Sequence, residues 1–246
     1  MPSEITLGPV TVRMFSLFLA LAIVLSIGIF ARRRGGRTGE SVDMALVVLV
    51  AALLGARLFH VFLHWDYFAD NLNEALRLNA GGLDWHGGLL GGLLALGLVS
   101  RWRQVSFRAA LDALTPALPL LALASWAGCA AAACAYGAEV DTLANYSSLV
   151  AAETRDVFGI VAPRYNTQLF GVALSLLLLL ITGLLFWRRW LYGRRFWLVL
   201  ALLSLGMFLI GVYRGDAVLV LAGMRGDQWL DIALVAVSLQ QSAFSH

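Results

Sequence analysis

Residues 81–92 combine an ionisable side chain with several glycines at the start of a long apolar run. Their sequence is GGLDWHGGLLGG, which places His86 between two glycine pairs. An imidazole at the edge of an apolar segment can accept a proton at neutral pH, and ionisable groups at membrane depth tend to mark functional sites. The glycines, including Gly87 and Gly88, allow a close approach of another backbone or of a lipid headgroup. A structural interpretation is equally available, in which His86 bonds a neighbouring helix and the glycines serve helix packing.

Arginines supply the other candidate chemistry. Arg57 lies in GARLFHV, well inside an apolar segment, where an arginine is costly unless it faces water, an acid or a phosphate. It could therefore contact a phosphate, or it could snorkel or pair with a carboxylate such as Asp84. Arg164, Arg214 and Arg225 stand next to other apolar segments and could hold an anionic headgroup, since a guanidinium matches phosphate oxygens in a bidentate manner.

Composition determines what must position these side chains. Hydrophobic residues make up 60% and charged residues 13% of the 246 residues, and a soluble domain carries about twice that share of charge. Apolar runs of membrane-spanning length recur along the chain. We therefore expect an all-α integral membrane protein, with residues 1–246 forming a single transmembrane domain. Hydropathy predicts a seven-helix polytopic bundle, with spans near 14–31, 42–63, 86–99, 109–136, 167–187, 196–213 and 229–244. The fourth span is long enough to tilt or break, helped by Pro116 and Pro119.

The distribution of arginine predicts the orientation of this bundle. Eleven of the eighteen basic residues lie in the first, third and fifth connections between the spans. By the positive-inside rule these connections are cytoplasmic, so the N-terminus is outside and the C-terminus is cytoplasmic. His86, residues 137–166 and residues 214–228 are then on the outer side. Residues 65–79 have apolar side chains three and four positions apart, which predicts an amphipathic arm lying on the outer leaflet or a short helix covering the bundle.

Two cysteines, Cys129 and Cys134, lie in an alanine-rich apolar segment. Small buried thiols are common in such segments, and the spacing is not that of a CxxC motif. No further metal ligands accompany them, so we expect no bound metal. We also expect no cofactor and no nucleic acid as a partner.

Five stretches of the chain, in order, resemble the prolipoprotein diacylglyceryl transferase family of bacteria. They are GPVTVRMFSL from Gly8, LLGARLFHVFLHWDYF from Leu53, GGLDWHGGLLGG, APRYNTQLFG from Ala162, and YRGD followed by DQWLDI. The blocks around H-G-G and G-A-R-L are the more specific, and together the five stretches span nearly the whole chain. The resemblance implies a seven-helix membrane fold with the N-terminus outside, in the bacterial plasma (inner) membrane. It carries over to these positions: His86, Gly87, Gly88, Arg57, Gln168, Gly137, Arg214 and Gln228.

The chain departs from the family pattern at several positions. A signature arginine of the fourth-span block reads Trp126, and a second arginine, in a later block, falls on Met207. Family glutamates fall on Gly171 and Gly211, and a family tyrosine falls on Phe15.

The resemblance implies transfer of a diacylglyceryl group from phosphatidylglycerol to the lipobox cysteine of prolipoproteins, forming a thioether and releasing glycerol phosphate. His86 would deprotonate the thiol, and Arg57 with Arg214 would hold the phosphate, as catalytic and substrate-binding residues. Gly87, Gly88, Gln168, Arg164 and Gly137 are the other expected substrate-binding residues. Two alternatives remain at this point: a non-catalytic lipid-binding homologue that has lost the transferase arginines, and a small-solute transporter.

Overall fold

The computed structural model describes residues 4–7, 10–77 and 81–243 of a mostly helical protein. Gly8 of the N-terminal motif, Asn79 at the end of the predicted arm and Phe244 at the end of the last predicted span lie outside the described residues. The chain forms two compact units. One contains Met1–Ser26 with Leu114–His246, and the other contains Ile27–Ala113.

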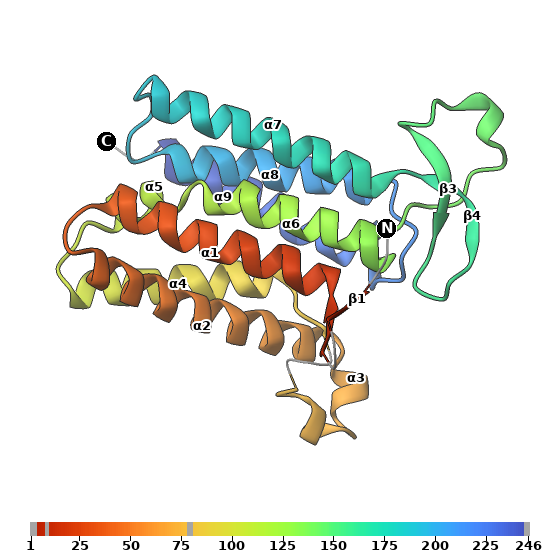
Figure 1. Cartoon of the computed structure of the whole chain (residues 1–246), viewed down its shortest axis with the longest axis horizontal. Coiled ribbons are helices and arrows are strands. Elements are labelled where there is room, and N and C mark those ends of the chain that lie inside the picture. Colours follow the sequence, from red (N-terminus) through yellow and green to blue (C-terminus); the bar gives the residue numbers. More distant parts are fainter. Residues whose placement is uncertain (1–3, 8–9, 78–80, 244–246) are drawn as a thin grey trace. The chain divides into compact units, whose positions relative to one another are not determined.

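The unit that carries His86 is built on two long helices, α2 (Thr38–Leu63) and α4 (Trp85–Trp102). They run alongside one another (Figure 1) and pack closely. A Cβ atom at Gly55 of α2 would lie 2.5 Å from the carbonyl oxygen of Gly87 in α4. A side chain there would therefore force the helices apart, so the glycines around His86 set the helix spacing. The same unit includes α3 (Trp65–Phe68), the 3₁₀ turn η1 (Leu72–Glu74) and most of α5 (Phe107–Leu114).

The second unit packs four helices in sequence order. These are α6 (Ala117–Ala132), α7 (Thr167–Trp187), α8 (Arg195–Gly211) and α9 (Gly226–Ala243), each in contact with the next. Its core includes the fully buried Leu178, Val199 and Leu200. The chain enters through an antiparallel pair, β1 (Glu4–Leu7) with β2 (Val10–Arg13), that leads into α1 (Met14–Arg34).

Two further antiparallel hairpins lie in the connections of this second unit. Strands β3 (Ala151–Arg155) and β4 (Val161–Tyr165) pair from Ala151 with Tyr165 to Arg155 with Val161. Strands β5 (Val220–Leu221) and β6 (Met224–Arg225) form a shorter pair before α9. The hydropathy pattern predicted only loops at these positions. It missed the hairpins because pairing of such short strands depends on partners that hydropathy does not identify.

Membrane-spanning helices account for much of the described chain. Four helical segments of the described chain are long and apolar enough to cross a bilayer: Met14–Arg34, Thr38–Leu63, Thr167–Trp187 and, taking α5 and α6 together, Phe107–Ala132. Arg195–Gly211 is a shorter apolar helix. Large apolar side chains point away from the packed interior, including Val24, Leu94 and Leu180, each at least 66% exposed. Many exposed large apolar side chains on long helices are unfavourable in water and normal against lipid tails. The prediction of an all-α multi-pass membrane protein is confirmed.

The fourth predicted span is interrupted where the sequence indicated. Helix α5 ends at Leu114 and α6 begins at Ala117. Pro116 lies between them, and proline disfavours helical backbone in the residue that precedes it. Pro119 falls in the first turn of α6, where a missing N–H costs little. Helix α6 ends at Ala132, short of the predicted residue 136, and Ala133 follows in the left-handed conformation with φ 57°.

The prediction that the amphipathic arm near residues 65–79 is one continuous helix is wrong. Only Trp65–Phe68 and Leu72–Glu74 are helical, with turns at Ala69–Asp70 and Ala75–Leu76. Tertiary contacts shape this segment instead: the carbonyls of Glu74 and Ala75 accept hydrogen bonds from the Arg57 side chain, and the Glu74 carbonyl also accepts the backbone N–H of Arg77 in a tight turn. Arg57 lies in another helix, and its effect on this segment is invisible in the local pattern.

The sequence suggested two small buried thiols, but the two cysteines are not free. Cys129 and Cys134 form a disulfide with a Cα–Cα distance of 4.6 Å. The turn of the chain at Ala133 after the end of α6 brings the two residues together. Five residues of separation within a continuing helix would have placed the side chains on different faces.

Candidate active site

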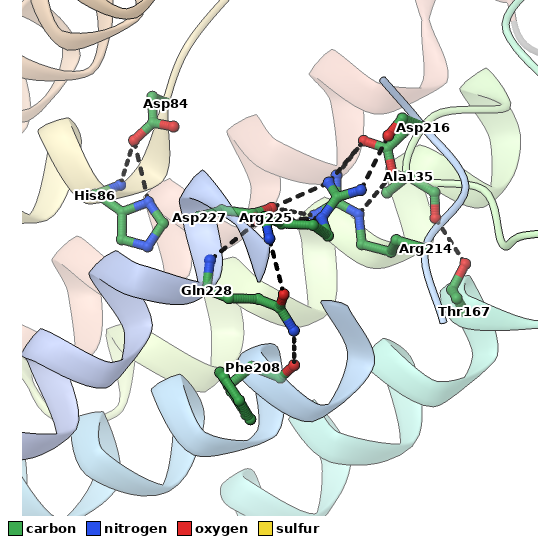
Figure 2. A network of polar contacts seen from close by, with 10 residues as sticks. All are labelled: Asp84, His86, Ala135, Thr167, Phe208, Arg214, Asp216, Arg225, Asp227 and Gln228. Atoms are coloured by element: carbon green, nitrogen blue, oxygen red, sulfur yellow. Dashed lines mark hydrogen bonds and ion pairs between the residues drawn. The ribbon is translucent and has the colours of Figure 1, made fainter. Parts of the chain in front are cut away.

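His86 lies in the first turn of α4 and is 3% exposed. The preceding Asp84 caps this helix: its Oδ1 atom accepts hydrogen bonds from the backbone N–H groups of His86 (2.8 Å) and Gly87 (3.2 Å). The same oxygen lies 3.3 Å from Nδ1 of the His86 ring, as Figure 2 shows. A buried imidazole paired with a carboxylate through one nitrogen is the arrangement of a general base.

The charge on Asp84 is maintained despite its partial burial. Burial by itself raises the pKa of Asp84, but its contacts with the His86 ring and with the two backbone N–H groups outweigh burial and lower that pKa below the usual value. Asp84 is therefore a carboxylate at neutral pH. This partner of His86 was not identified from the sequence, which offered Asp84 as a partner for Arg57.

Arg57 is buried, with 3% of its surface exposed, and its guanidinium donates four hydrogen bonds to backbone carbonyls. Nε donates to Ala75 (2.7 Å), and the two terminal nitrogens donate to Glu74 (2.7 Å), Gly81 (2.5 Å) and Gly82 (3.1 Å). The ring of Phe68 lies 5.2 Å from its Cζ atom. These contacts favour a role in holding the segment before His86 over the phosphate contact predicted from the sequence.

Gly87 and Gly88 face α2 rather than open space. A Cβ at Gly87 would overlap the Phe59 side chain, and one at Gly88 would lie 3.4 Å from the Ala52 carbonyl oxygen. Of the two interpretations of these glycines, close backbone approach and headgroup approach, the geometry supports the first.

A cluster of two arginines and two aspartates follows the end of α8 (Figure 2). Arg214 binds Asp216 through Nε (2.8 Å) and contacts Asp227 at 3.5 Å, while Arg225 contacts Asp227 at 3.1 Å and Asp216 at 3.4 Å. We call these four residues the arginine–aspartate cluster. Gln228 extends it: its Oε1 accepts from the Arg225 backbone N–H, and its Nε2 donates to the carbonyl of Phe208 in α8.

A cavity of about 500 Å³ lies against this cluster. Its polar lining includes Arg214, Asp216 and Arg225, and its apolar walls include Val218 and Met224. The volume is within the usual range for a small-molecule site. Burial lowers the pKa of Arg214, but the carboxylates of Asp216, Asp227 and Asp231 together raise it by more, so the net shift is upward. Burial raises the pKa of Asp216, but Arg214, Arg225 and a backbone hydrogen bond together lower it by more, so the net shift is downward. Both groups are charged at neutral pH.

Arg164 supports the β3–β4 hairpin. It is 5% exposed and forms ion pairs with Glu139 (2.8 Å) and Asp156 (3.1 Å), and its Cζ lies 5.0 Å from the ring centre of Tyr136. Asp156 in turn accepts from the backbone N–H groups of Phe158 and Ile160 in the hairpin turn. To bind Arg164 as predicted, a substrate phosphate would therefore have to compete with these two carboxylates for its guanidinium.

Two other predicted residues make backbone contacts in the same unit. Gly137 pairs with Arg214 in an isolated β-bridge, and a Cβ at Gly137 would overlap the Tyr165 carbonyl. Gln168 is 6% exposed, and its Nε2 donates to the carbonyl of Cys134 (3.0 Å). Thr167 donates to the carbonyl of Ala135 (2.7 Å). These bonds join the start of α7 to the chain that follows α6.

Two of the departures from the family pattern contact one another. Trp126 is 5% exposed, and a Cβ added at Gly171 would overlap its indole ring. The tryptophan that stands at the arginine position is thus packed against the glycine that stands at a glutamate position. Gly211, at another glutamate position, leaves room for Gln228, whose Cγ would lie 3.0 Å from an added Cβ. At positions 126 and 171 a packed neutral pair therefore stands where the family pattern has an arginine and a glutamate.

Asp84, Asp216 and Asp227 are the functional candidates that sequence reasoning did not single out. Each stands within two residues of a histidine or arginine that it contacts, and this local spacing was the available signal. Within the part of the chain that the structure describes, no group of three or more His, Cys, Asp or Glu residues is arranged to hold a metal ion.

Comparison with known proteins agrees with the motifs. The family described as prolipoprotein diacylglyceryl transferase matches residues 2–242. A phosphatidylglycerol–prolipoprotein diacylglyceryl transferase of Symbiobacterium thermophilum is 31% identical, with 97% of this chain and 90% of that protein covered. A protein of the same name from Streptococcus pneumoniae is 29% identical, with 97% and 91% covered. This chain belongs to the prolipoprotein diacylglyceryl transferase family.

Proposed function

We propose that this protein transfers the diacylglyceryl group of phosphatidylglycerol to the lipobox cysteine of a prolipoprotein. The observation that carries the proposal is the buried His86–Asp84 pair at the start of α4, in a chain that belongs to the transferase family. The relatives that match almost the full length carry the name of this activity.

In the proposed reaction His86 takes the proton of the cysteine thiol. The thiolate sulfur then forms a bond to the glyceryl carbon, and the bond between that carbon and the phosphate oxygen breaks. Glycerol phosphate leaves with the electron pair of the broken bond, and the product is a thioether. A thiol is a poor nucleophile until it is deprotonated, which is why the reaction needs a base at this position.

The departing phosphate gains negative charge and needs a fixed cation. The resemblance to the family carries this role to Arg214, which lies in the other compact unit and there lines the cavity of the arginine–aspartate cluster together with apolar side chains. Asp216 and Asp227 orient its guanidinium, and its longest contact, 3.5 Å to Asp227, leaves that edge the easiest to redirect toward a phosphate. Arg57 contributes by holding the segment that leads to His86.

We expect transfer to be slow. Trp126 and Met207 stand where the family pattern has arginines, and removing one preorganised donor from such a site costs about a hundredfold or more in rate. A tryptophan packed against Gly171 occupies position 126, so this position supplies no guanidinium.

We also propose the finer topology: seven spans in one transmembrane domain of the bacterial inner membrane, with the N-terminus outside. Helices α4 and α9 have 18 residues each and α8 has 17, and 18 residues extend for about 27 Å. The Cys129–Cys134 disulfide supports an outer location for the end of α6, because disulfides persist in oxidising compartments. A cysteine introduced at Arg189 should react with an impermeant reagent only after the membrane is opened; labelling in intact cells would reverse the orientation.

The test of function is rescue of a bacterium whose own transferase can be switched off. Expression of this chain should restore growth and lipidation of a lipobox reporter, and the His86→Gln variant, expressed to the same level, should not. In purified form, the wild type should release glycerol phosphate from phosphatidylglycerol only when a lipobox peptide is present. If the wild type neither rescues growth nor lipidates the peptide, the proposal is wrong.

A further inference from the structure

The turn between β3 and β4 presents a row of large apolar side chains on the protein surface. Val157, Phe158 and Ile160 are 58%, 80% and 59% exposed, and Val161 follows at 56%. A cluster of exposed large apolar side chains marks a contact surface for a partner or a membrane. The proposed transfer reaction uses none of these four residues, so the hairpin tip calls for a separate explanation.

The backbone of this turn satisfies its own donors. Oδ1 of Asp156 accepts hydrogen bonds from the N–H groups of Phe158 and Ile160, both at 2.9 Å. The N–H of Gly159 donates to the carbonyl of Asp156 at 3.1 Å, and its φ of 86° is a conformation that glycine adopts readily. Unsatisfied backbone N–H groups oppose the entry of irregular chain into lipid, and these three bonds remove that cost.

The carboxylate that organises the turn is itself paired inside the hairpin. Asp156 and Arg164 are each 5% exposed, and Oδ2 of Asp156 accepts from the Arg164 guanidinium at 3.1 Å. The buried charges therefore balance one another behind the tip. Arg155, at the end of β3, is exposed, and its long side chain can keep its charge at the level of lipid headgroups while the neighbouring tip lies deeper.

The hairpin starts where a membrane-spanning helix begins. Strand β4 ends at Tyr165 and α7 begins at Thr167, and α7 is long and apolar enough to cross a bilayer. The two strands run across the direction of α7 rather than continuing along it (Figure 1). A five-residue strand extends for about 17 Å, so this length carries the tip sideways, along the membrane surface.

Aromatic rings support the same level for the base of the hairpin. The ring centre of Tyr165 lies 5.7 Å from that of Tyr146 and 5.1 Å from that of Tyr213. Tyrosine is enriched at membrane–water interfaces, where the ring meets apolar groups and the hydroxyl meets water. The three tyrosines therefore place the base of the hairpin in the interfacial layer.

We propose that the tip of the β3–β4 hairpin is a membrane finger, with Val157, Phe158 and Ile160 inserted into the lipid leaflet in which α7 begins. The occupant of this surface is the bilayer itself, because the tip adjoins the surface that α7 presents to lipid. Insertion follows from the structure of the hairpin and does not depend on the transfer reaction.

The finger is joined by backbone bonds to the segment that carries Arg214. The N–H of Tyr165 donates to the carbonyl of Ala138 (3.0 Å), and the N–H of Ala138 donates to the carbonyl of Tyr213 (2.8 Å). Gly137 pairs with Arg214 in the next position. An inserted tip therefore fixes the depth of the Arg214 segment relative to the lipid headgroups.

Depth measurement with a nitroxide label tests the insertion. Phe158→Cys and, separately, Ile160→Cys are labelled in nanodiscs of phosphatidylglycerol and phosphatidylethanolamine; the native cysteines form a disulfide and do not react. Asp141→Cys, an exposed position of the same connection, is the aqueous control, and Leu180→Cys, at a 73% exposed position of α7, is the lipid control. Oxygen concentrates in lipid and a nickel chelate stays in water, so their relative collision rates report depth.

We expect the labels at 158 and 160 to be about 5–10 Å below the headgroup surface, with the label at 141 in water. Labels at 158 and 160 that match the label at 141 would overturn the proposal.

Crosslinking distinguishes lipid from other occupants of the tip. Phe158 is replaced by the photoreactive p-benzoylphenylalanine, and the protein is irradiated in the same nanodiscs without any peptide. We expect an adduct with the mass of a phospholipid. A crosslink to a second copy of the chain, or to another segment of the same chain, would refute the membrane finger; if no crosslink forms, the measured depth decides.

Discussion

Replacing Arg57 with lysine retains the positive charge but removes the planar fork that holds the segment before His86. The four hydrogen bonds of the guanidinium reach carbonyls of Glu74, Ala75, Gly81 and Gly82. A lysine has three donors on a single nitrogen and cannot span acceptors that lie around the edge of a guanidinium. We expect Arg57→Lys to lose at least two of these bonds and to leave their carbonyls less well satisfied.

The size of the effect follows from these contacts. Hydrogen bonds that involve a charged group contribute about 1.5–3 kcal/mol each, so two lost bonds cost roughly 3–6 kcal/mol. In a chain of this size that corresponds to a fall in melting temperature on the order of 10 °C. Arg37→Lys is the control: the Arg37 side chain is 88% exposed, with one ion pair to Glu40 at 3.7 Å, so its replacement should change stability by less than about 1 kcal/mol.

Two measurements on the purified protein in nanodiscs test this prediction. Thermal unfolding gives the loss of stability, and hydrogen–deuterium exchange shows where the structure opens. Exchange in Arg57→Lys should rise in peptides that cover 67–77 and 81–85 and remain unchanged in α7. If stability and exchange match the wild type while phosphatidylglycerol binding is lost, Arg57 is a phosphate ligand and the reasoning from its carbonyl contacts is wrong.

Three further predictions concern the other unit. Trp126→Arg alone should destabilise the protein by about 3–5 kcal/mol, because it buries a charge without a partner; adding Gly171→Glu should recover much of that loss and raise the transfer rate above that of the wild type. Despite burial, the pKa of Asp216 is lowered, with Arg214 as the main lowering partner. The ion pair therefore stabilises the fold above the usual carboxyl pKa of about 4, and this stabilisation is lost as the pH falls through the lowered pKa. Asp216→Asn should lower the melting temperature at pH 7 and reduce the further drop in melting temperature at acidic pH. Reduction of the Cys129–Cys134 disulfide should cost about 2 kcal/mol, given the small loop that it closes.

Each of these predictions has a result that would contradict it. A Trp126→Arg, Gly171→Glu protein no more stable than Trp126→Arg alone would show that the two positions are not coupled. Parallel melting curves of wild type and Asp216→Asn between pH 7 and pH 3 would remove the linkage assigned to Asp216. Labelling of both cysteines by a maleimide before any reductant is added would exclude the disulfide.

The sequence alone determined the membrane fold and which side chains to consider. Spanning helices follow from hydropathy, because a bilayer core demands long apolar segments with internally satisfied backbones. The break at Pro116 follows from the geometry of proline. His86 and Arg57 could be selected because an ionisable group is costly in an apolar run wherever its partners lie.

Tertiary structure alone determined what those side chains contact. The carbonyls that Arg57 binds are 17 to 25 residues away, and a backbone carbonyl carries no mark in the sequence. Trp126 and Gly171 are read as separate departures from the family pattern until packing of α6 on α7 brings them into contact. The disulfide required a helix end at Ala132, which alanine-rich sequence does not signal. Hydropathy and residue type report the cost of placing a group in lipid; the partners that offset this cost are set by the packing of distant segments.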